Sequence, residues 1–131
     1  YQDIRDYEKY LSRNGFVIFK FFLHISKDEQ KKRFLRRINL PKKHWKFSSA
    51  DIRERQYWDK YQKAYEKAIN ATATKKNPWY VVPADDKWYS RLIVSDILTK
   101  EIEKLPLAYP VLSPDEAARL DTAKEELLNE K

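Results

Sequence analysis

Hydrophobic residues recur along the first part of the chain at two different intervals. Over Ile4–Leu11 they follow helical spacing, which predicts a helix that the Asn14-Gly15 pair ends. The next run, Phe16–Ile25 (FVIFKFFLHI), is apolar on both faces and rich in residues that favour strands. A strand with two apolar faces belongs inside a parallel sheet that helices cover. We therefore expect a buried strand here.

Polar caps then divide the middle of the chain into two helices. Ser26, with Glu29 three residues later, forms a capping box that opens the first helix, which ends near Pro41. Ser48 or Ser49 caps the second helix, whose apolar residues keep helical spacing to about residue 71.

A second strand and two more helices follow. Trp79–Val82 (WYVV) is a short apolar strand flanked by prolines. Asp85 or Asp86 caps the next helix, which extends to about Ile102. A linker rich in proline covers residues 105–114, and Ser113–Glu116 then places Ser, Pro and Glu at the favoured first positions of a last helix.

This order of elements predicts an α/β fold that is mostly helical and holds two short parallel strands. Two strands alone make a poor sheet. We therefore expect one edge of the strand Phe16–Ile25 to need a partner strand that this chain does not supply.

Charge is distributed unevenly over the 131 residues, whose net charge is +7. Residues 27–67 hold fourteen Lys or Arg and six Asp or Glu, whereas residues 101–131 hold four and eight. The hydrophobic content of 42% is that of a folded domain rather than a disordered chain. The basic part predicts a polyanionic partner: nucleic acid, polyphosphate, a nucleotide or an anionic lipid.

Several classes of protein are excluded by what the sequence lacks. There is no cysteine, so there is neither a disulfide framework nor a thiolate metal site, which fits a cytosolic protein. The longest apolar run is too short to span a bilayer. Gly15 is the single glycine, which excludes both common glycine-rich phosphate loops, GxxxxGK[ST] and GxGxxG.

The segment Pro41–Tyr61 interleaves cations with aromatic rings, a pattern typical of surfaces that bind polyanions. Its cations are Lys42, Lys43, Lys46, Arg53, Arg55 and Lys60, and its rings are Trp45, Phe47, Tyr57, Trp58 and Tyr61. The pattern predicts a lid that handles phosphate groups.

Three sequence blocks together resemble the type-2 polyphosphate kinase family. They are KFFLHISKDEQKKRF (Lys20–Phe34), RINLPKKHWKFSSADIRERQYW (Arg37–Trp58) and PWYVVPADDKWYSR (Pro78–Arg91), and they stand in the family's order over most of residues 1–105. One departure is Asn39-Leu40, where the family usually has two acidic residues.

The resemblance implies the C-terminal portion of a P-loop kinase-like fold, in an enzyme that moves phosphoryl groups between polyphosphate and nucleotides. Residues 1–105 would belong to the catalytic domain, with the lid at about 27–71, and residues 106–131 would form a linker and a C-terminal helix. The family's phosphate loop and its Mg²⁺-binding aspartate lie on strands that are absent from this chain. The resemblance also favours a cytoplasmic homo-oligomer, and it implies that this chain alone is inactive.

The same resemblance implies the site residues. Arg33 and Arg37 lie four residues apart and so share a helix face, and they are the candidate catalytic residues. Lys46 and Arg55 are candidates for polyphosphate contacts across the lid, and the block after the second strand adds Asp86 and Lys87 near the nucleotide or the lid. No residue is a candidate metal ligand. A solvated helix face is the competing explanation for any one of these cations.

Other residues favour structural roles. Trp45, Phe47 and Trp58 are expected to pack the hinge of the lid. Lys20 must be paired if it is buried; otherwise it lies at the mouth of its strand or extends its ammonium group to solvent. His24 is expected to be satisfied structurally.

Two other functions remain open from the residues. The chain could be a basic helical module that binds nucleic acid without catalysis, or a purely structural or interaction domain.

Overall fold

The computed structural model describes residues 1–130, which divide into two compact units, one over residues 1–100 and one from Glu101 onward. The elements along the chain are α1 (Gln2–Arg13), β1 (Lys20–His24), α2 (Lys27–Ile38), a 3-10 helix (Pro41–Lys46), α3 (Ser49–Glu54), a 3-10 turn (Arg55–Tyr57), α4 (Trp58–Thr72), β2 (Trp79–Pro83), α5 (Lys87–Ile102) and α6 (Pro114–Leu128). The expected domain boundary near residue 105 stays a prediction.

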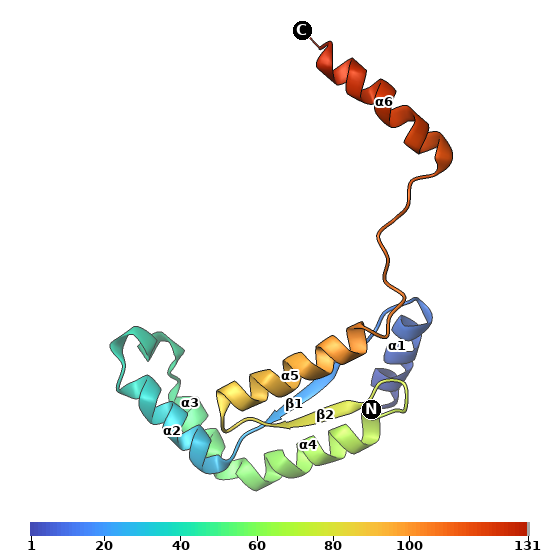
Figure 1. Ribbon diagram of the computed structural model, residues 1–131. Coiled ribbons are helices and arrows are strands. Elements are labelled where there is room, and N and C mark those ends of the chain that lie inside the picture. Colours follow the sequence, from blue (N-terminus) through green and yellow to red (C-terminus); the bar gives the residue numbers. More distant parts are fainter. Residues whose placement is uncertain (131) are drawn as a thin grey trace. The chain divides into compact units, whose positions relative to one another are not determined.

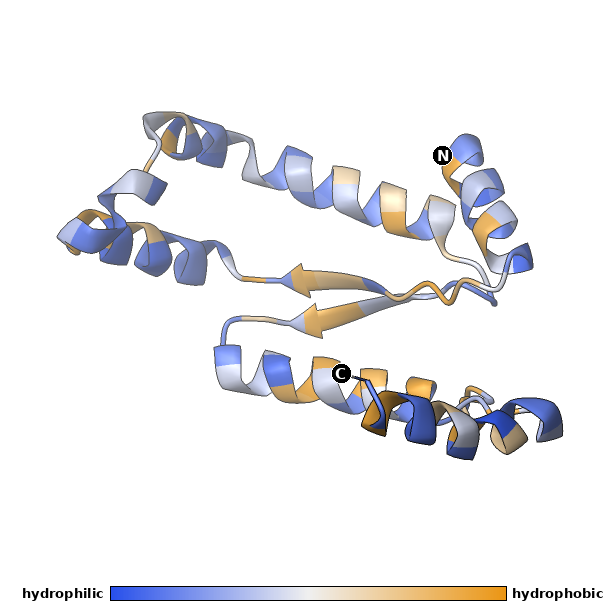
Figure 2. Cartoon of the chain, turned by 90° about the horizontal axis from the view of Figure 1, so that it is seen from above, coloured by the Kyte–Doolittle hydropathy of each residue, from blue (hydrophilic) through white to orange (hydrophobic). Residues whose placement is uncertain are grey.

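The centre of the first unit is a two-stranded parallel sheet. β1 pairs with β2 in a register that sets Lys20 opposite Trp79 and His24 opposite Pro83. Helices α4 and α5 lie on opposite faces of this sheet, and Figure 2 shows the strands as hydrophobic segments between them. The predicted α/β class with two parallel strands is therefore confirmed.

Strand β1 is half as long as predicted. The sequence predicted a strand over Phe16–Ile25, but only Lys20–His24 pairs with β2. The physical reason is the length of the partner, because β2 offers five residues and the described residues supply no strand on the other edge of β1. Phe16 and Val17 are 60% and 51% exposed.

The segment between the strands is more broken than predicted. The expected helix from Ser48 or Ser49 to about residue 71 is interrupted at Arg55–Tyr57 by a 3-10 turn, so that α3 and α4 are separate helices. The 3-10 helix Pro41–Lys46 begins with proline at its first position, where the missing N–H costs nothing. In Figure 1, α2, the 3-10 helix and α3 extend from the ends to which both strand arrows point, and α4 runs back along the sheet.

The two helices that follow the strands begin at the predicted caps. The Ser26 hydroxyl accepts a hydrogen bond from the Glu29 N–H at the start of α2. The predicted capping box is not completed, because the Glu29 carboxylate binds Arg33 and the Ser26 N–H donates to Asp85. Of the two candidate caps for α5, the structure selects Asp86, whose Oδ1 accepts from the N–H groups of Trp88 and Tyr89. Both helix N-termini therefore lie at the carboxyl ends of the strands, where open α/β sheets place their ligands.

A buried ion pair anchors the opposite end of the sheet. Lys20 is 8% exposed, and its ammonium group donates to both carboxylate oxygens of Glu8, at 2.8 and 2.9 Å, and to the Thr72 carbonyl at 2.9 Å. The structure thus settles the alternatives for Lys20: it is buried and paired. These bonds join α1, β1 and the end of α4 at one point.

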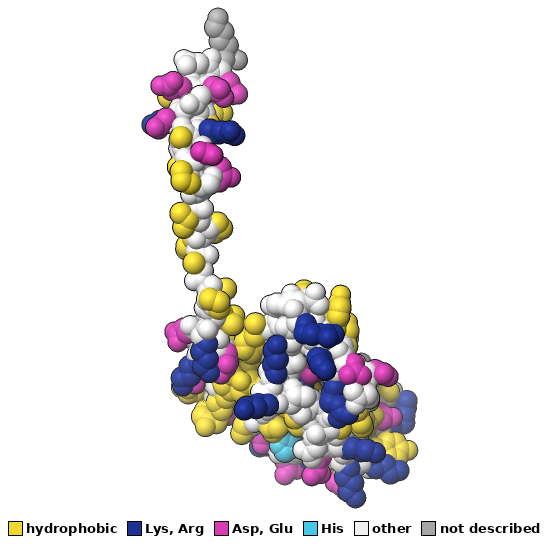
Figure 3. Space-filling model, turned by 90° about the vertical axis from the view of Figure 1, so that its right-hand side faces the viewer, with side chains coloured by type: hydrophobic (Ala, Val, Ile, Leu, Met, Phe, Trp, Pro, Cys, Tyr) yellow, Lys and Arg dark blue, Asp and Glu magenta, His cyan; other side chains and the backbone are white. Residues whose placement is uncertain are grey.

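The second unit contains the linker and α6. α6 begins with the predicted capping box, in which Ser113 and Glu116 exchange hydrogen bonds. Acidic side chains and exposed apolar ones cover this unit in Figure 3, and Tyr109 and Val111 are 96% and 94% exposed. No helix among residues 1–130 is long and apolar enough to cross a membrane.

Candidate functional site

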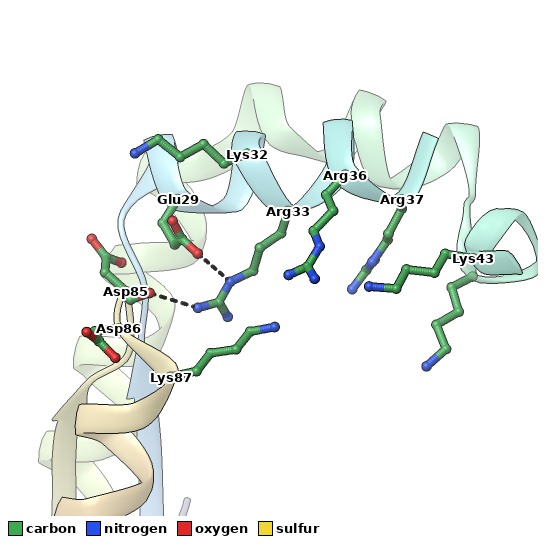
Figure 4. Close-up of a pocket in the computed structure, with 10 residues that line it drawn as sticks. Glu29, Lys32, Arg33, Arg36, Arg37, Lys43, Asp85, Asp86 and Lys87 are labelled. Carbon is green, nitrogen blue, oxygen red and sulfur yellow. Dashed lines mark hydrogen bonds and ion pairs between the residues drawn. The ribbon is translucent and has the colours of Figure 1, made fainter. Parts of the chain in front are cut away.

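A pocket of about 790 Å³ lies at the carboxyl ends of the strands. Seven cations and three carboxylates line this basic pocket, which gives it a formal charge of +4. Its residues are Glu29, Lys32, Arg33, Arg36, Arg37, Lys43, Lys46, Asp85, Asp86 and Lys87. Figure 4 shows Arg36 and Arg37 of α2, Lys43 of the 3-10 helix and Lys87 at the start of α5 pointing into one space. The net positive charge makes the pocket suited to an anion.

Arg33 is already engaged by the protein. Its Nε donates to Glu29 at 2.8 Å, and its Nη2 donates to the carbonyls of Ala84 and Asp85 at 2.6 and 3.3 Å (Figure 4). These bonds join α2 to the loop between β2 and α5. Arg33 therefore holds the two sides of the pocket together, a structural role that is neither the catalytic role nor the solvated helix face that the sequence left open.

The three carboxylates of the basic pocket also have partners. Glu29 binds Arg33, and Asp86 caps α5. Asp85 accepts a hydrogen bond of 2.7 Å from the Ser26 backbone N–H, and this bond holds the pKa of Asp85 below its ordinary value of 3.8. The three carboxylates thus fix the loops of the pocket, and of its seven cations only Arg33 pairs with one of them.

Five cations of the pocket have no hydrogen bond or ion pair among the residues that the structure describes: Lys32, Arg36, Lys43, Lys46 and Lys87. Figure 4 shows three of them, Arg36, Lys43 and Lys87, pointing toward one another from three different elements. Repulsion by Arg36, joined by partial burial and by Lys87, lowers the pKa of Lys43 below its ordinary value of 10.5. Cations that crowd together without a counter-charge are expected where a protein receives a multivalent anion.

Arg37 and Lys46 line the same pocket in looser contacts. Arg37 lies 4.0 Å from the Asp51 carboxylate and over the Phe34 ring. Lys46 lies over the Trp45 ring, 4.6 Å from its centroid. Trp45 itself is 79% exposed, so the prediction that it packs the hinge is wrong.

Arg55 lies elsewhere. It lines a second pocket of about 460 Å³ on another face of α2, which we call the aromatic pocket, and its Nη1 donates to the Gln30 side chain and the Lys27 carbonyl. The structure therefore gathers five of the six predicted site residues (Arg33, Arg37, Lys46, Asp86 and Lys87) and separates Arg55 from them.

Sequence reasoning missed Arg36 and Lys43. The search for arginines four residues apart selected Arg33 and Arg37, but Arg36 lies between them on the same face of α2. Lys43 follows Pro41 in the lid segment and belonged to the basic run that was noted as a whole. A signal for Arg36 was present, since a helix face covers positions three apart as well as four.

The described residues do not fit a metal site. No group of three or more His, Asp or Glu side chains among residues 1–130 is placed to hold an ion. The carboxylates of the basic pocket are occupied by an arginine, a backbone N–H and a helix N-terminus. What the pocket offers is hydrogen-bond donors and positive charge, which bind phosphate oxygens and neutralise charge on a phosphoryl group.

Comparison with known proteins also points to phosphate chemistry. A model of the family "Polyphosphate kinase 2 (PPK2)" matches residues 1–107. An ADP-polyphosphate phosphotransferase of Rhodopseudomonas palustris is 52% identical over 128 residues, which are 98% of this chain and 44% of that protein. The crystal structure of Polyphosphate Kinase 2 from Arthrobacter aurescens TC1 superposes with a TM-score of 0.86 at 44% identity, over 95% of this chain and 44% of that one.

The chain thus spans less than half the length of these two relatives. It spans nearly the whole of a third, a Leptolyngbya boryana protein described as "Uncharacterized protein in chlN 3'region", which is 50% identical over 99% of this chain and 96% of its own length. The family match and the fold agree with the resemblance that the three sequence blocks indicated. The chain belongs to the polyphosphate kinase 2 family.

Proposed function

We propose that this chain is the lid-bearing part of a polyphosphate-dependent nucleotide kinase, which transfers a phosphoryl group between inorganic polyphosphate and a nucleoside di- or monophosphate. The observation that carries the proposal is the basic pocket, with Arg36, Lys43 and Lys87 converging at the carboxyl ends of two parallel strands. Relatives named ADP-polyphosphate phosphotransferase and AMP/ADP-polyphosphate phosphotransferase support the substrate class.

In this proposal the basic pocket binds the phosphate chain. The bond between the terminal phosphorus and its bridging oxygen breaks, and a new bond forms to a terminal phosphate oxygen of the nucleotide. Polyphosphate leaves one unit shorter, and a nucleoside diphosphate becomes a triphosphate. Arg36, Lys43 and Lys87 neutralise the charge on the oxygens that surround the transferred phosphorus, and Arg37 and Lys46 extend this surface. Arg33 acts as a positioning residue through its bonds to the β2–α5 loop.

The chain would depend on other parts of the enzyme for the rest of the chemistry. The resemblance implies Mg²⁺, but the residues of this chain do not fit a site for it, so the proposal places the ion outside these residues. With one glycine the chain has no glycine-rich phosphate loop of its own. We propose that the enzyme is a cytoplasmic homo-oligomer whose lid is the segment at about 27–71, and that this chain alone is inactive.

The proposal is tested by assaying phosphoryl transfer from polyphosphate to ADP with Mg²⁺. The protein encoded by the complete reading frame around this chain should form ATP, and its Arg36→Ala variant should lose at least tenfold in rate, the order expected for one charge-assisted contact to phosphate. The matched variant Arg13→Ala, on the exposed surface of α1, should keep full activity. ATP formation by the pure 131-residue chain would contradict its predicted inactivity.

The competing function is a basic module that binds nucleic acid. Seven cations in one pocket would also attract nucleic acid. The affinity for polyphosphate and the affinity for nucleic acid would both fall steeply as the salt concentration rises. The names of the relatives, ADP-polyphosphate phosphotransferase and AMP/ADP-polyphosphate phosphotransferase, favour a phosphate chain over nucleic acid. We therefore rank nucleic acid second.

A further inference from the structure

The aromatic pocket is a second cavity of the first unit, and phosphate binding does not use it. It lies on the face of α2 that carries Gln30 and Phe34, next to the face that carries the basic pocket. Its rings come from β1, α2 and α4: Phe22, Phe34, Trp58, Tyr61 and Tyr65. Its volume of about 460 Å³ is within the range of roughly 300–1,000 Å³ that small-molecule sites occupy.

Three of these rings, Phe22, Tyr65 and Tyr61, are in contact. The centroid of Phe22 lies 4.9 Å from that of Tyr65, and the Tyr65 ring stacks with Tyr61 at 6.3 Å. Tyr61 and Tyr65 are 42% and 43% exposed, so their faces are open to a ligand. Stacking on such rings is available to every nucleobase, because each base has a π-face.

The rim of the pocket carries groups that can both donate and accept hydrogen bonds. The Gln62 carbonyl oxygen is engaged by His24 at 3.1 Å, and that of Gln30 by Arg55 at 2.5 Å, which leaves both amide NH₂ groups as donors. Glu54 accepts from the Tyr61 hydroxyl at 2.7 Å through one oxygen, and its other oxygen remains an acceptor. Base edges and ribose hydroxyls need such mixed partners.

Charge distinguishes the two pockets. Two carboxylates, Asp51 and Glu54, and one cation, Arg55, line the aromatic pocket, so its formal charge is −1, against +4 in the basic pocket. A chain of phosphates would be repelled from the aromatic pocket, whereas a neutral nucleoside would not. The two pockets therefore favour different parts of the two substrates.

The ion pair between Arg37 and Asp51 connects the basic pocket with the aromatic pocket. Arg37 lines the basic pocket, Asp51 lines the aromatic pocket, and their charged groups lie 4.0 Å apart and are both partly exposed. A nucleoside on the aromatic rings could extend its phosphates past this pair toward Arg37. Transfer requires the two substrates to meet end to end, and this arrangement would supply the meeting point.

We propose that the aromatic pocket binds the nucleoside of the nucleotide substrate, with the base against Tyr65, Tyr61 and Trp58 and its polar edge toward Gln62 and Glu54. The proposal rests on the proposed function, because it takes the nucleotide as one of the two substrates. It assigns to Arg55, the predicted site residue outside the basic pocket, a place beside the nucleotide rather than beside polyphosphate.

The test uses adenosine, which has no phosphate and so cannot be held by the basic pocket. Saturation-transfer NMR on the 131-residue chain should detect adenosine, and Tyr65→Leu should reduce the saturation transferred at least fivefold. Gln62→Ala, which changes only a partly exposed side chain at the rim, should reduce it as well. The matched control Trp45→Leu removes an exposed ring outside the pocket and should leave it unchanged.

Tripolyphosphate, titrated in parallel, separates this proposal from the proposed function. Tyr65→Leu and Gln62→Ala should bind it within twofold of the unaltered chain, and Arg36→Ala should bind it more weakly while still receiving adenosine. Absence of adenosine binding, or an adenosine signal that Arg36→Ala abolishes and Tyr65→Leu and Gln62→Ala leave intact, would overturn the nucleoside site. Adenosine binding without any tripolyphosphate binding would support the nucleoside site and count against the basic pocket as a phosphate site.

Discussion

At the scale of single residues, the three arginines on the pocket face of α2 differ in what they already bind. Arg33 is held by a carboxylate and two backbone carbonyls, and Arg37 lies near Asp51. Arg36, between them, has no such partner among the described residues and points into the basic pocket (Figure 4). An arginine without a counter-charge inside a cationic pocket is available to a phosphate, so Arg36 should matter most for binding and Arg33 most for the shape of the site.

We predict that Arg36→Ala weakens the binding of tripolyphosphate to the chain about tenfold, because one charge-assisted hydrogen bond is lost. The melting temperature should stay within a few degrees of the original. Arg33→Ala should lower both the affinity and the melting temperature. Isothermal titration calorimetry and circular dichroism measure the two quantities. Equal affinities for the unaltered chain and Arg36→Ala would show that the pocket does not bind phosphate through this residue.

A second prediction at this scale concerns Glu8. Replacing it by Gln leaves the buried Lys20 ammonium without its counter-charge, which should lower the free energy of unfolding by about 3–5 kcal/mol. Urea unfolding followed by circular dichroism measures this loss. Asp96→Asn, which breaks the exposed pair with Lys100, is the matched control and should cost about 1 kcal/mol or less.

Combining Glu8→Leu with Lys20→Met should recover most of the loss, because two apolar side chains replace the ion pair without leaving a charge behind. If Glu8→Gln is no more damaging than Asp96→Asn, the pair does not anchor α1 to the sheet.

At the scale of elements, the site depends on two loops that leave the strands side by side. The turn after β1 leads into α2, and the turn after β2 leads into α5. Asp85 joins them by accepting the Ser26 N–H, and Arg33 joins them by donating to Ala84 and Asp85. The cations of α2 and Lys87 of α5 are therefore positioned by contacts between residues more than fifty positions apart in the sequence.

The Asp85 contact predicts a pH dependence. Because the folded state lowers the pKa of Asp85, its contribution to stability is fully present above the ordinary value of 3.8 and is lost as the pH falls through the lowered pKa. Asp85→Asn should therefore melt at a lower temperature than the original chain at about pH 6, and the difference should shrink toward about pH 2. A difference that is constant over this range would show that the charge of Asp85 plays no part.

Local sequence signals predicted where the helices begin, but they did not predict the features that depend on contacts between elements. The capping residues Ser26 and Asp86 and the proline at position 114 placed the helix starts, because caps act within one turn. The length of β1 depended on its partner strand, so the apolar run alone overestimated it. The break between α3 and α4 at Arg55–Tyr57 contains no proline or glycine, so the sequence carried no signal for it.

The same distinction applies to the site. Five of the six predicted residues line the basic pocket, and all five lie in the sequence blocks that resemble the family. Arg55 lies in the other pocket, because its position depends on how α3 and α4 turn relative to α2. Glu8, the partner of Lys20, lies on the apolar side of α1 four residues after Ile4, and this polar residue in an apolar stripe was a signal that could have been followed.

At the scale of the whole molecule, the first unit buries few apolar side chains. Val82 and Ala84 are the buried apolar residues among residues 1–130, and the sheet there has two strands. Large apolar residues at the strands, such as Leu23 and Val81, are 54% and 55% exposed. Both strands also keep one free edge, which is a template for pairing with another chain.

We therefore predict that the 131-residue chain self-associates as its concentration rises, through these edges and apolar faces. Sedimentation velocity measures the effect, and the apparent mass should increase with concentration. A chain that stays monomeric and well folded at high concentration would contradict this prediction, because its strand edges and apolar faces would then be stable without a partner.

The measurement that tests the central claim most directly is a competition between polyphosphate and DNA on the 131-residue chain. A labelled single-stranded oligonucleotide is bound, and long-chain polyphosphate is added at physiological salt while fluorescence anisotropy is followed. We predict that polyphosphate displaces the oligonucleotide at matched phosphate concentration, and that combining Arg36→Ala with Lys43→Ala and Lys87→Ala removes this advantage. Failure of polyphosphate to displace tightly bound DNA would contradict the claim and favour a nucleic-acid-binding module.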